Sequence, residues 1–249
     1  QVGASELDAL ISRTLFATAR ETSRYAINGV LLNVKKNKVE MVATDGRRLA
    51  LARGAASGGG KDLEVSCIIP TKALSLVSKL IDTPDEHVRV AITDNQVMFA
   101  FGDADQAPHA ILASTLVEGA FPPYEDVIPK DQDKRAVFDV TVLRSGVRRA
   151  ALLTNEESRG VRLKFSGKGA KGLNLTSRAP EMGEAEIDVD VSSYDGDEIE
   201  IGFNPSFLTD ALKVVTEAEV VIELKAPNKP GLIKAGSDFM YVVMPVSLS

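Results

Sequence analysis

The 249 residues exceed the roughly 100–200 that a single hydrophobic core usually organises, so the length alone predicts two domains. Hydrophobic residues make up 44% and charged residues 26%, which is typical of a folded soluble protein and excludes a disordered chain. The formal net charge of −6 excludes a simple polycation for nucleic acid, and the longest apolar runs, such as residues 239–245, are too short to cross a bilayer.

The first half of the chain has the apolar spacing of two amphipathic helices, each followed by an alternating strand. These elements are predicted, in chain order, at residues 7–20, 28–31, 71–81 and 88–92. Ser23-Arg24 separates the first helix from its strand, and Pro70 stands near the start of the second helix, where its fixed φ suits the first turn. The N-terminus has neither the basic nor the apolar region of a signal peptide.

The second half repeats this order, including a second Ser-Arg pair, Ser158-Arg159, before a Gly-Val strand. The corresponding elements are predicted at residues 141–153, 160–163, 206–215 and 220–224. Thr141 is expected to cap the first of these helices and Asn204 the second. The offset between the halves is 131 residues at the first strand and 135 at the proline before the second helix, and two nearly equal offsets indicate an internal repeat.

The repeat defines the expected fold class, which is α+β. Each copy has two helices and seven or eight short strands, and such units place their helices on one face of antiparallel sheets. Residues 129–135 are polar and charged without apolar periodicity, so they are predicted to form a linker. The predicted domains are therefore residues 1–129 and 136–249.

No residue constellation in the sequence indicates an enzyme, a metal site or a bound cofactor. His87 and His109 lack partners at metal-ligand spacing, and the acidic run at residues 181–200 alternates with apolar residues as a solvated strand face does. The tract at residues 58–61 lacks the flanking residues of a phosphate loop and indicates a flexible hairpin connection. The single cysteine, Cys67, excludes an internal disulfide, suits a reducing compartment and is expected to be a small buried hydrophobe.

Basic residues concentrate on the predicted helices. The central helix windows carry a net charge of +7, which leaves −13 for the rest of a chain whose formal charge is −6. Pairs spaced four or seven apart share a helix face, as in Arg13/Arg20, Lys72/Lys79 and Arg144/Arg148. Such faces suit sequence-independent contact with phosphates, although a merely solvated helix face has the same spacing.

Several segments have more specific motifs. Residues 42–50, Val-Ala-Thr-Asp-Gly-Arg-Arg-Leu-Ala, closely resemble a signature of the bacterial DNA polymerase III β subunit, the sliding clamp. Further segments resemble the same family in the same order, at residues 24–29, 121–124, 155–156, 159–163, 202–204 and 241–245. The resemblance implies a clamp middle domain followed by a clamp C-terminal domain. It also implies that the family's N-terminal domain is absent, which would explain the missing initiator Met.

The family forms a head-to-tail dimeric ring around duplex DNA, with helices lining the hole. The resemblance therefore implies these DNA-facing residues: Arg13, Arg20, Arg24, Lys72, Lys79, Arg144 and Arg148. It also matches Leu152 and Leu153 to the apolar subunit interface, which pairs the last domain with another subunit's first domain. We expect a chain without that first domain to be mainly monomeric, and we expect the protein to be cytoplasmic.

The family also recruits DNA polymerase, clamp-loader subunits and repair proteins through short linear peptides, which bind a pocket between the middle and last domains. By motif match the resemblance implies these pocket residues: Ile27, Thr44, Gly46, Arg47, Arg48, Leu49, Pro122, Val127, Asn204, Phe207, Val242, Val243, Met244 and Pro245. Asp126 stands where some clamps carry a basic residue, and residues 246–249 replace a Met-Arg-Leu ending, so peptide preference is expected to differ there.

Three function classes are compatible with the sequence. The first is a clamp fragment that binds partner peptides and encircles DNA in the full protein. The second is a stand-alone DNA-binding module, which predicts strong DNA affinity for this chain alone. The third is an enzyme, which would need a polar constellation that the sequence lacks.

Overall fold

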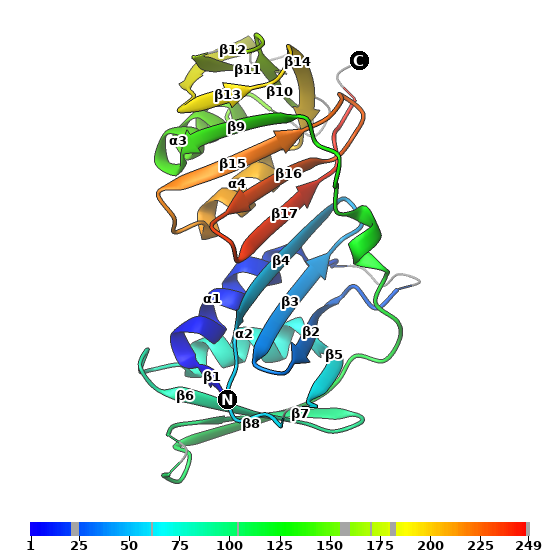
Figure 1. Cartoon of the computed structure of the whole chain (residues 1–249), viewed down its shortest axis with the longest axis vertical. Coiled ribbons are helices and arrows are strands. Elements are labelled where there is room, and N and C mark those ends of the chain that lie inside the picture. Colours follow the sequence, from blue (N-terminus) through cyan, green and yellow to red (C-terminus); the bar gives the residue numbers. More distant parts are fainter. Residues whose placement is uncertain are drawn as a thin grey trace. The chain divides into compact units, whose positions relative to one another are not determined.

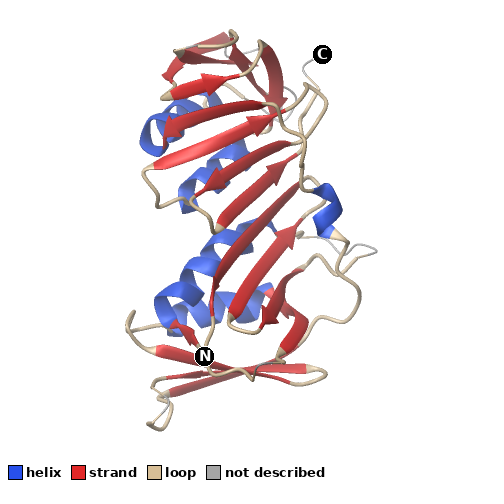
Figure 2. Ribbon diagram, in the orientation of Figure 1, coloured by secondary structure: helices blue, strands red, loops and turns tan. Residues whose placement is uncertain are grey.

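The computed structural model describes residues 1–20, 25–60, 62–103, 105–154, 160–169, 171–179 and 183–247. The chain divides into two compact units, unit 1 (Gln1–Tyr124) and unit 2 (Glu125–Ser249). Within the described ranges each unit has two α-helices against antiparallel sheets, which confirms the predicted α+β fold class (Figure 1, Figure 2). Some positions used in the sequence analysis lie outside the described residues: Ser23, Arg24, Lys61, Asn155, Glu156, Ser158 and Arg159.

Unit 1 begins with a two-residue strand and alternates strands with two helices. Its elements are β1 (Val2–Gly3), α1 (Ala4–Thr14), the 3₁₀ turn η1 (Leu15–Ala17), β2 (Gly29–Lys35), β3 (Lys38–Thr44), β4 (Arg48–Ala55), β5 (Glu64–Pro70), α2 (Thr71–Leu80), β6 (His87–Ile92), β7 (Gln96–Phe101) and β8 (Ala110–Thr115). A second 3₁₀ turn, η2 (Tyr124–Val127), follows.

The strands of unit 1 form two antiparallel sheets, with orders β4-β3-β2-β5 and β1-β6-β7-β8. Helix α1 contacts β3, β4 and β6, and α2 contacts β5 and β8, so the helix pair lies against both sheets (Figure 1). The buried core combines helix residues such as Leu10 and Leu74 with strand residues such as Met41 and Phe99. Burial of these apolar faces is what holds the unit together.

The first helix is shorter than the predicted residues 7–20. Helix α1 ends at Thr14, whose hydroxyl donates to the Leu10 carbonyl oxygen at 2.8 Å, and the 3₁₀ turn η1 follows. A side-chain bond back to the preceding turn is a common local competitor of helix propagation. Arg20 therefore lies beyond the helix, and the prediction that it shares a helix face with Arg13 is wrong.

Unit 2 repeats the arrangement with one additional short strand. Its elements are β9 (Lys134–Asp139), α3 (Val140–Ala151), β10 (Val161–Phe165), β11 (Gly172–Ala179), β12 (Gly183–Asp190), β13 (Ser193–Asp195), β14 (Ile199–Phe203), α4 (Pro205–Val214), β15 (Glu219–Leu224), β16 (Gly231–Ala235) and β17 (Phe239–Val243). The strand orders within the unit are β12-β11-β10-β14 and β13-β9-β15-β16-β17. The residues predicted as a linker, 129–135, lie in unit 2, and β9 begins at Lys134.

The helix caps of unit 2 correct one prediction and confirm another. Helix α3 is capped by Asp139 rather than by Thr141: the Asp139 carboxylate accepts hydrogen bonds from two backbone N–H groups of the first turn, at 2.8 and 3.1 Å, and from the Thr141 hydroxyl. An aspartate two residues earlier in the chain supplies the better acceptor. Asn204 caps α4, as predicted, and Pro205 is the first residue of the helix, where its fixed φ suits the first turn.

The glycine-rich connection after β4 is not a hairpin. Strands β4 and β5 stand at the two ends of the order β4-β3-β2-β5, so the connection between them does not join two paired neighbours. The hairpin prediction failed because strand pairing over a whole sheet cannot be read from the local turn residues. None of the helices in the described part of the chain has the length and apolar character needed to cross a membrane.

Candidate functional site

The turn between β3 and β4 is built by its own side chains. The Asp45 carboxylate accepts hydrogen bonds from the backbone N–H groups of Arg47 and Arg48, at 2.9 and 3.1 Å. The Thr44 hydroxyl accepts from the Gly46 N–H at 3.1 Å and donates to the Arg48 carbonyl oxygen at 2.7 Å. Gly46 has a φ of +84°, a left-handed conformation that glycine adopts without strain. The turn is therefore a rigid, self-supported loop.

The two arginines of this turn have different surroundings. The Arg48 guanidinium is ion-paired with Asp45 at 3.0 Å, donates to the Phe16 carbonyl oxygen at 2.9 Å and lies 5.5 Å from the centre of the Phe16 ring. Its side chain is only 10% exposed. Arg47 is exposed. Arg48 thus fixes the turn against η1, and Arg47 is the guanidinium that the turn presents to solvent.

The predicted pocket residues of unit 1 fall into two groups. Ile27, Thr44 and Leu49 are buried, with 9%, 7% and 3% of their surfaces exposed. Gly46 and Arg47 are exposed, and Arg48 and Pro122 are half-buried. The buried group can only support a binding surface from beneath. Only the exposed and half-buried group can contact a partner directly.

The predicted pocket residues of unit 2 divide in the same way. Val242 and Val243 are 3% and 1% exposed, whereas Val127 and Met244 are 51% and 44% exposed. The remaining three residues, Asn204, Phe207 and Pro245, are half-buried. Asn204 caps α4, and the Phe207 carbonyl oxygen accepts a 3.1 Å hydrogen bond from the Tyr241 hydroxyl. Pro245 lies after the end of β17.

Met244 and Pro245 also line a cleft on unit 2 of about 970 Å³. The walls of this cleft include the β14 edge, the start of β9 and the residues that follow β15. The chain end at Val246 is held there by a 2.9 Å hydrogen bond from its N–H to the Gly202 carbonyl oxygen. The exposed thioether of Met244 is a flexible apolar contact that adapts to the shape of a partner.

A charged cluster stands beside this cleft. Asp133 accepts hydrogen bonds from the ammonium groups of Lys134 at 2.8 Å and Lys225 at 2.9 Å. These two bonds lower the pKa of Asp133 from its ordinary 3.8 to about 2, and the same contact raises the pKa of Lys225. Lys134 also donates to the Lys225 carbonyl oxygen at 3.0 Å. The cluster ties β9 to the end of β15.

Four of the predicted DNA-facing residues are exposed cations: Arg20, Lys72, Lys79 and Arg148. Arg13 is half-buried, and Arg24 lies outside the described residues. Lys72 and Lys79 are both on α2 and both exposed, as their seven-residue spacing predicts. The exposed cations can contact an anion without desolvation of a buried charge.

Arg144 has a structural role that the sequence analysis did not identify. Its guanidinium donates to the carbonyl oxygens of Leu212 and Val215, both at 2.9 Å. These carbonyls lie at the C-terminus of α4, where four acceptors lack partners within the helix and cations are favoured. Arg144 therefore joins α3 to α4. The spacing of Arg144 from Arg148 does not indicate this role, because the carbonyl groups that accept its hydrogen bonds are about seventy residues away in the chain.

The end of α3 carries the residues matched to a ring interface. Leu152 is 69% exposed and Leu153 is half-buried. Most of the Leu152 side chain is therefore accessible to solvent on unit 2.

The cysteine, the histidines and the acidic strand show no sign of a metal centre. Cys67 is 8% exposed, as predicted, and burial raises the pKa of its thiol to about 11, so it is an inert core residue. His109 lies 2.9 Å from the Glu86 carboxylate. The carboxylates of β12 are exposed, as predicted for a solvated strand face. In the ranges that the structure describes, no three His, Cys, Asp or Glu side chains are grouped to hold a metal ion.

Two family models match this chain one after the other. The model for the DNA polymerase III β subunit central domain matches residues 1–123, and the model for the C-terminal domain of the same subunit matches residues 125–247. The chain belongs to the DNA polymerase III β subunit family. The division between the two matches coincides with the boundary between unit 1 and unit 2.

Individual relatives agree with this assignment. The chain is 38% identical over 246 residues to the beta sliding clamp of Pseudomonas putida, covering 98% of this chain and 64% of the relative. A crystal structure of the β subunit from Pseudomonas aeruginosa matches with a TM-score of 0.89 at 36% identity, covering 99% of this chain and 66% of that one. A sliding clamp structure from Bacillus subtilis matches with a TM-score of 0.91 at 28% identity, covering 99% and 63%. The chain thus spans about 64% of the length of the curated relatives it matches.

Proposed function

We propose that the chain is part of a DNA sliding clamp, a non-catalytic processivity factor that encircles duplex DNA as a ring and recruits DNA polymerase and repair proteins through short linear peptides. The observation that carries this proposal is the pair of consecutive matches to the β subunit's central and C-terminal domains, which together reach from residue 1 to residue 247. In the full-length protein the ring would be a head-to-tail homodimer.

The exposed cations of the helices support a DNA-facing role. Lys72 and Lys79 on α2 and Arg148 on α3 are exposed, and so is Arg20, which follows η1. Phosphate contacts of this kind are sequence-independent and weaken with salt, which suits a ring that slides. Arg144 would contribute indirectly, by holding α3 and α4 together.

The peptide-binding role is supported by two sets of residues, one on each unit. In unit 1 the rigid turn presents Arg47 above buried Thr44 and Leu49. In unit 2 Val127 and Met244 are exposed apolar side chains, and Val242 is buried. Apolar surfaces that rest on a packed core suit Leu or Phe anchors of a peptide. Affinity for one such peptide is expected near ~10⁻⁶ M, about −8 kcal/mol, because few residues are buried.

The ring-closing role rests on unit 2. Leu152 is the most exposed of the large apolar residues in the described chain, at 69%, and it stands at the end of α3. We propose that Leu152 and Leu153 pack against a first domain of another subunit. Burial of one such leucine contributes roughly 1.5–3 kcal/mol to an interface.

A DNA titration of the 249-residue chain tests the proposed mode of action. Without ring closure we expect only weak binding to linear duplex, with a Kd above ~10⁻⁴ M at physiological salt, because separate phosphate contacts are individually weak. Charge reversal Lys72→Glu should reduce the residual low-salt binding, and Lys229→Glu, in the loop after β15, is the matched control that should not. Saturable micromolar binding by the isolated chain would support the stand-alone DNA-binding module instead.

A further inference from the structure

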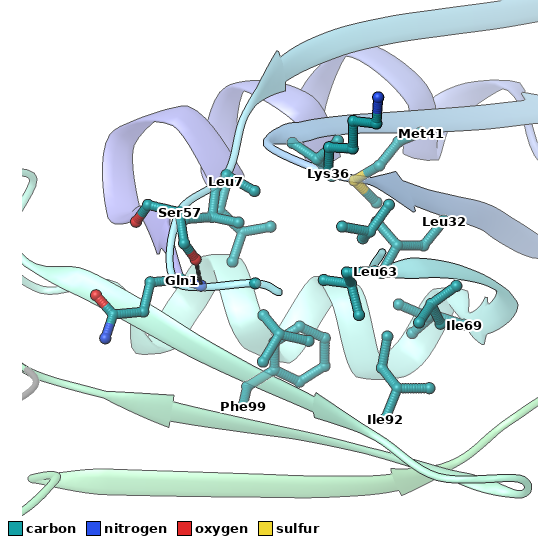
Figure 3. A pocket seen from close by; sticks show the side chains of 18 of the residues that line it. Gln1, Leu7, Leu32, Lys36, Met41, Ser57, Leu63, Ile69, Ile92 and Phe99 are labelled. Carbon is teal, nitrogen blue, oxygen red and sulfur yellow. Dashed lines mark hydrogen bonds between the residues drawn. The ribbon is translucent and has the colours of Figure 1, made fainter. Parts of the chain in front are cut away.

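Unit 1 contains an apolar cavity of about 350 Å³ that its own core side chains leave unfilled. Figure 3 shows Leu7, Leu32, Met41, Leu63 and Phe99 around it, contributed by α1, β2, β3, the connection before β5 and β7. Well-packed cores have few voids larger than a water molecule. A cavity of this size lies within the range of small-molecule sites, about 300–1,000 Å³.

A comparison with unit 2 shows why the cavity exists. Val2 precedes the N-cap of α1 and pairs with Val88, just as Phe138 precedes the N-cap of α3 and pairs with Val220. Val2 and Phe138 therefore hold equivalent positions. A phenylalanine in unit 2 is replaced by a smaller side chain in unit 1.

The same replacement occurs on the neighbouring sheet. Val34 pairs with Val65, five residues before the N-cap of α2, and Phe165 pairs with Ile199, five residues before the N-cap of α4. In unit 2 the Phe165 ring lies 6.2 Å from that of Phe138. Both valines of unit 1 line its cavity.

The third part of the difference is the connection that leads from β4 to β5 in unit 1 and from β12 to β14 in unit 2. In unit 2 this connection contains β13, whose Tyr194 stacks on Phe165 with ring centres 4.7 Å apart. In unit 1 the described part of the connection, residues 56–60 and 62–63, is rich in glycine and contains no strand. Three aromatic rings that fill unit 2 are thus replaced in unit 1 by two valines and a segment of glycines, and the cavity is the space they leave.

Residues 56–60 and Leu63 of the glycine-rich connection form a roof over the cavity. The Ala56 N–H donates to the Asn37 carbonyl oxygen at 2.9 Å, and the Leu63 carbonyl oxygen accepts from the Lys36 N–H at 2.9 Å. Both ends of the roof are therefore tied to the turn between β2 and β3. A Cβ at Gly59 would lie 2.5 Å from the end of the Leu63 side chain, which would have to move to admit it.

Lys36 places a cation at the rim of the cavity. Its stem lines the cavity, and its ammonium points away from the apolar side chains (Figure 3). The φ of Lys36 is +55°, and it is the only non-glycine residue with positive φ in the described chain. Lys36 is the first residue of the two-residue turn between β2 and β3, and hairpin turns of this length favour a positive φ at that position. Lys35 beside it pairs with Glu64 at 3.0 Å, whereas no salt bridge joins Lys36 to a described residue.

We propose that this cavity binds a single-chain aliphatic carboxylate, with the hydrocarbon chain inside and the carboxylate at Lys36. The apolar lining selects a hydrocarbon, the Lys36 cation at the rim selects an anionic head group, and the volume admits one chain rather than a two-chain lipid. The proposal goes beyond the proposed clamp function, because none of the cavity-lining residues belongs to the DNA-facing or peptide-binding sets.

Methionine-methyl NMR with sodium decanoate tests the site directly. Met41 is fully buried and lines the cavity, whereas Met98 and Met244 lie on the surface and do not. Decanoate below its micelle-forming concentration is expected to shift the Met41 methyl signal saturably and to leave the other two unchanged. Decyltrimethylammonium, with the same chain and the opposite charge, is expected to bind at least threefold more weakly.

Two variants separate the cavity from the rim charge. Val34→Phe copies the side chain of unit 2 into unit 1 and should reduce decanoate binding at least tenfold. Lys36→Gln should weaken it about twofold to fivefold, as an exposed ion pair does, while Lys38→Gln in the same turn should leave it unchanged. The Lys36 and Lys38 variants keep the test decisive if Val34→Phe does not fold.

Three results would overturn the proposal. One is the absence of a saturable Met41 shift. Another is equal binding of the two probes, or of the Lys36→Gln and Lys38→Gln variants. The third is a shift of Met98 or Met244 that matches that of Met41, which would show adsorption of decanoate to the surface.

Discussion

The two units share one strand order and one helix pair, but they are completed in different ways. Unit 2 fills its core with stacked aromatic rings, caps both helices with side chains and joins them through Arg144. Unit 1 has no side-chain cap hydrogen bond on α1 or α2 and retains a cavity of about 350 Å³. The common fold is therefore specified by the pattern of apolar residues, and the local interactions that stabilise it can differ between the two copies.

The largest difference in stability between the two units is expected at the aromatic cluster of Phe138, Phe165 and Tyr194. Phe165→Ala should lower the free energy of unfolding of unit 2 by about 3–5 kcal/mol, because a fully buried ring is lost and a cavity is left. Val34→Ala at the equivalent position of unit 1 should cost about 1 kcal/mol or less, because that side chain already borders a void. Denaturant unfolding of the two variants measures both values. Equal losses would mean that the two cores are packed alike.

The next effect concerns the link between α3 and α4. Arg144→Ala removes two hydrogen bonds from a charged donor and should destabilise unit 2 by about 2 kcal/mol. Arg148→Ala, one turn later and exposed, should change stability by less than about 0.5 kcal/mol. Thermal unfolding of the Arg144→Ala and Arg148→Ala variants measures both losses of stability. If both variants lost the same stability, Arg144 would have no special structural role.

A smaller effect is expected at the first helix caps. Asp139→Ala should cost about 1 kcal/mol, since two N–H groups of α3 lose their acceptor. At the equivalent Gly3 of unit 1, Gly3→Ser should add a few tenths of a kcal/mol, because a Cβ there meets nothing closer than 3.9 Å and the hydroxyl supplies a missing cap. Calorimetry of the two variants would contradict this comparison if Gly3→Ser were destabilising.

The smallest effect is a dependence on acidic pH that Asp133 and Asp139 confer on unit 2. The pKa of Asp133 is lowered to about 2 by its lysine partners, and that of Asp139 is lowered by the Thr141 hydroxyl and two backbone N–H groups. A carboxylate with a depressed folded-state pKa stabilises the fold above its unfolded value of 3.8, and this contribution is lost as pH falls through 2. The stability difference between the wild type and Asp133→Asn should therefore be constant above about pH 5, decrease as pH falls through 3.8 and 2, and vanish near about pH 1. A difference that persisted at about pH 1 would rule out the lysine pair as its source.

Local patterns were sufficient to predict much of this structure. The apolar spacing of residues 71–81 and the Asn204-Pro205 start of α4 correspond closely to the observed helices, because these signals lie within a few residues of the element they define. Residues 42–50 carried the family resemblance because the β3–β4 turn is held by its own side chains. These features can be predicted because they are determined by residues that are close together in the sequence.

The remaining features depend on contacts between distant residues. Nothing in the sequence near Arg144 indicates that its partners are the carbonyls that end α4, and nothing near residue 58 indicates that β5 pairs with β2. Motif matching also could not distinguish exposed Arg47 from Arg48, which is held by Phe16 and Asp45. The cavity of unit 1 is lined by side chains from several separate strands and helices, so no local pattern around Val34 indicates it.

The peptide-binding role is tested most directly by fluorescence anisotropy with a labelled Gln-Leu-type clamp-binding peptide. The wild-type chain should bind with a Kd near ~10⁻⁶ M, and Met244→Ala should weaken binding about tenfold, as loss of a contact of roughly 1.4 kcal/mol does. Met98→Ala is the matched control, since Met98 and Met244 are both 44% exposed but only Met244 belongs to the proposed set. Micromolar binding that is lost in Met244→Ala and kept in Met98→Ala is the predicted result. No binding by the wild type, or equal binding by both variants, would contradict it.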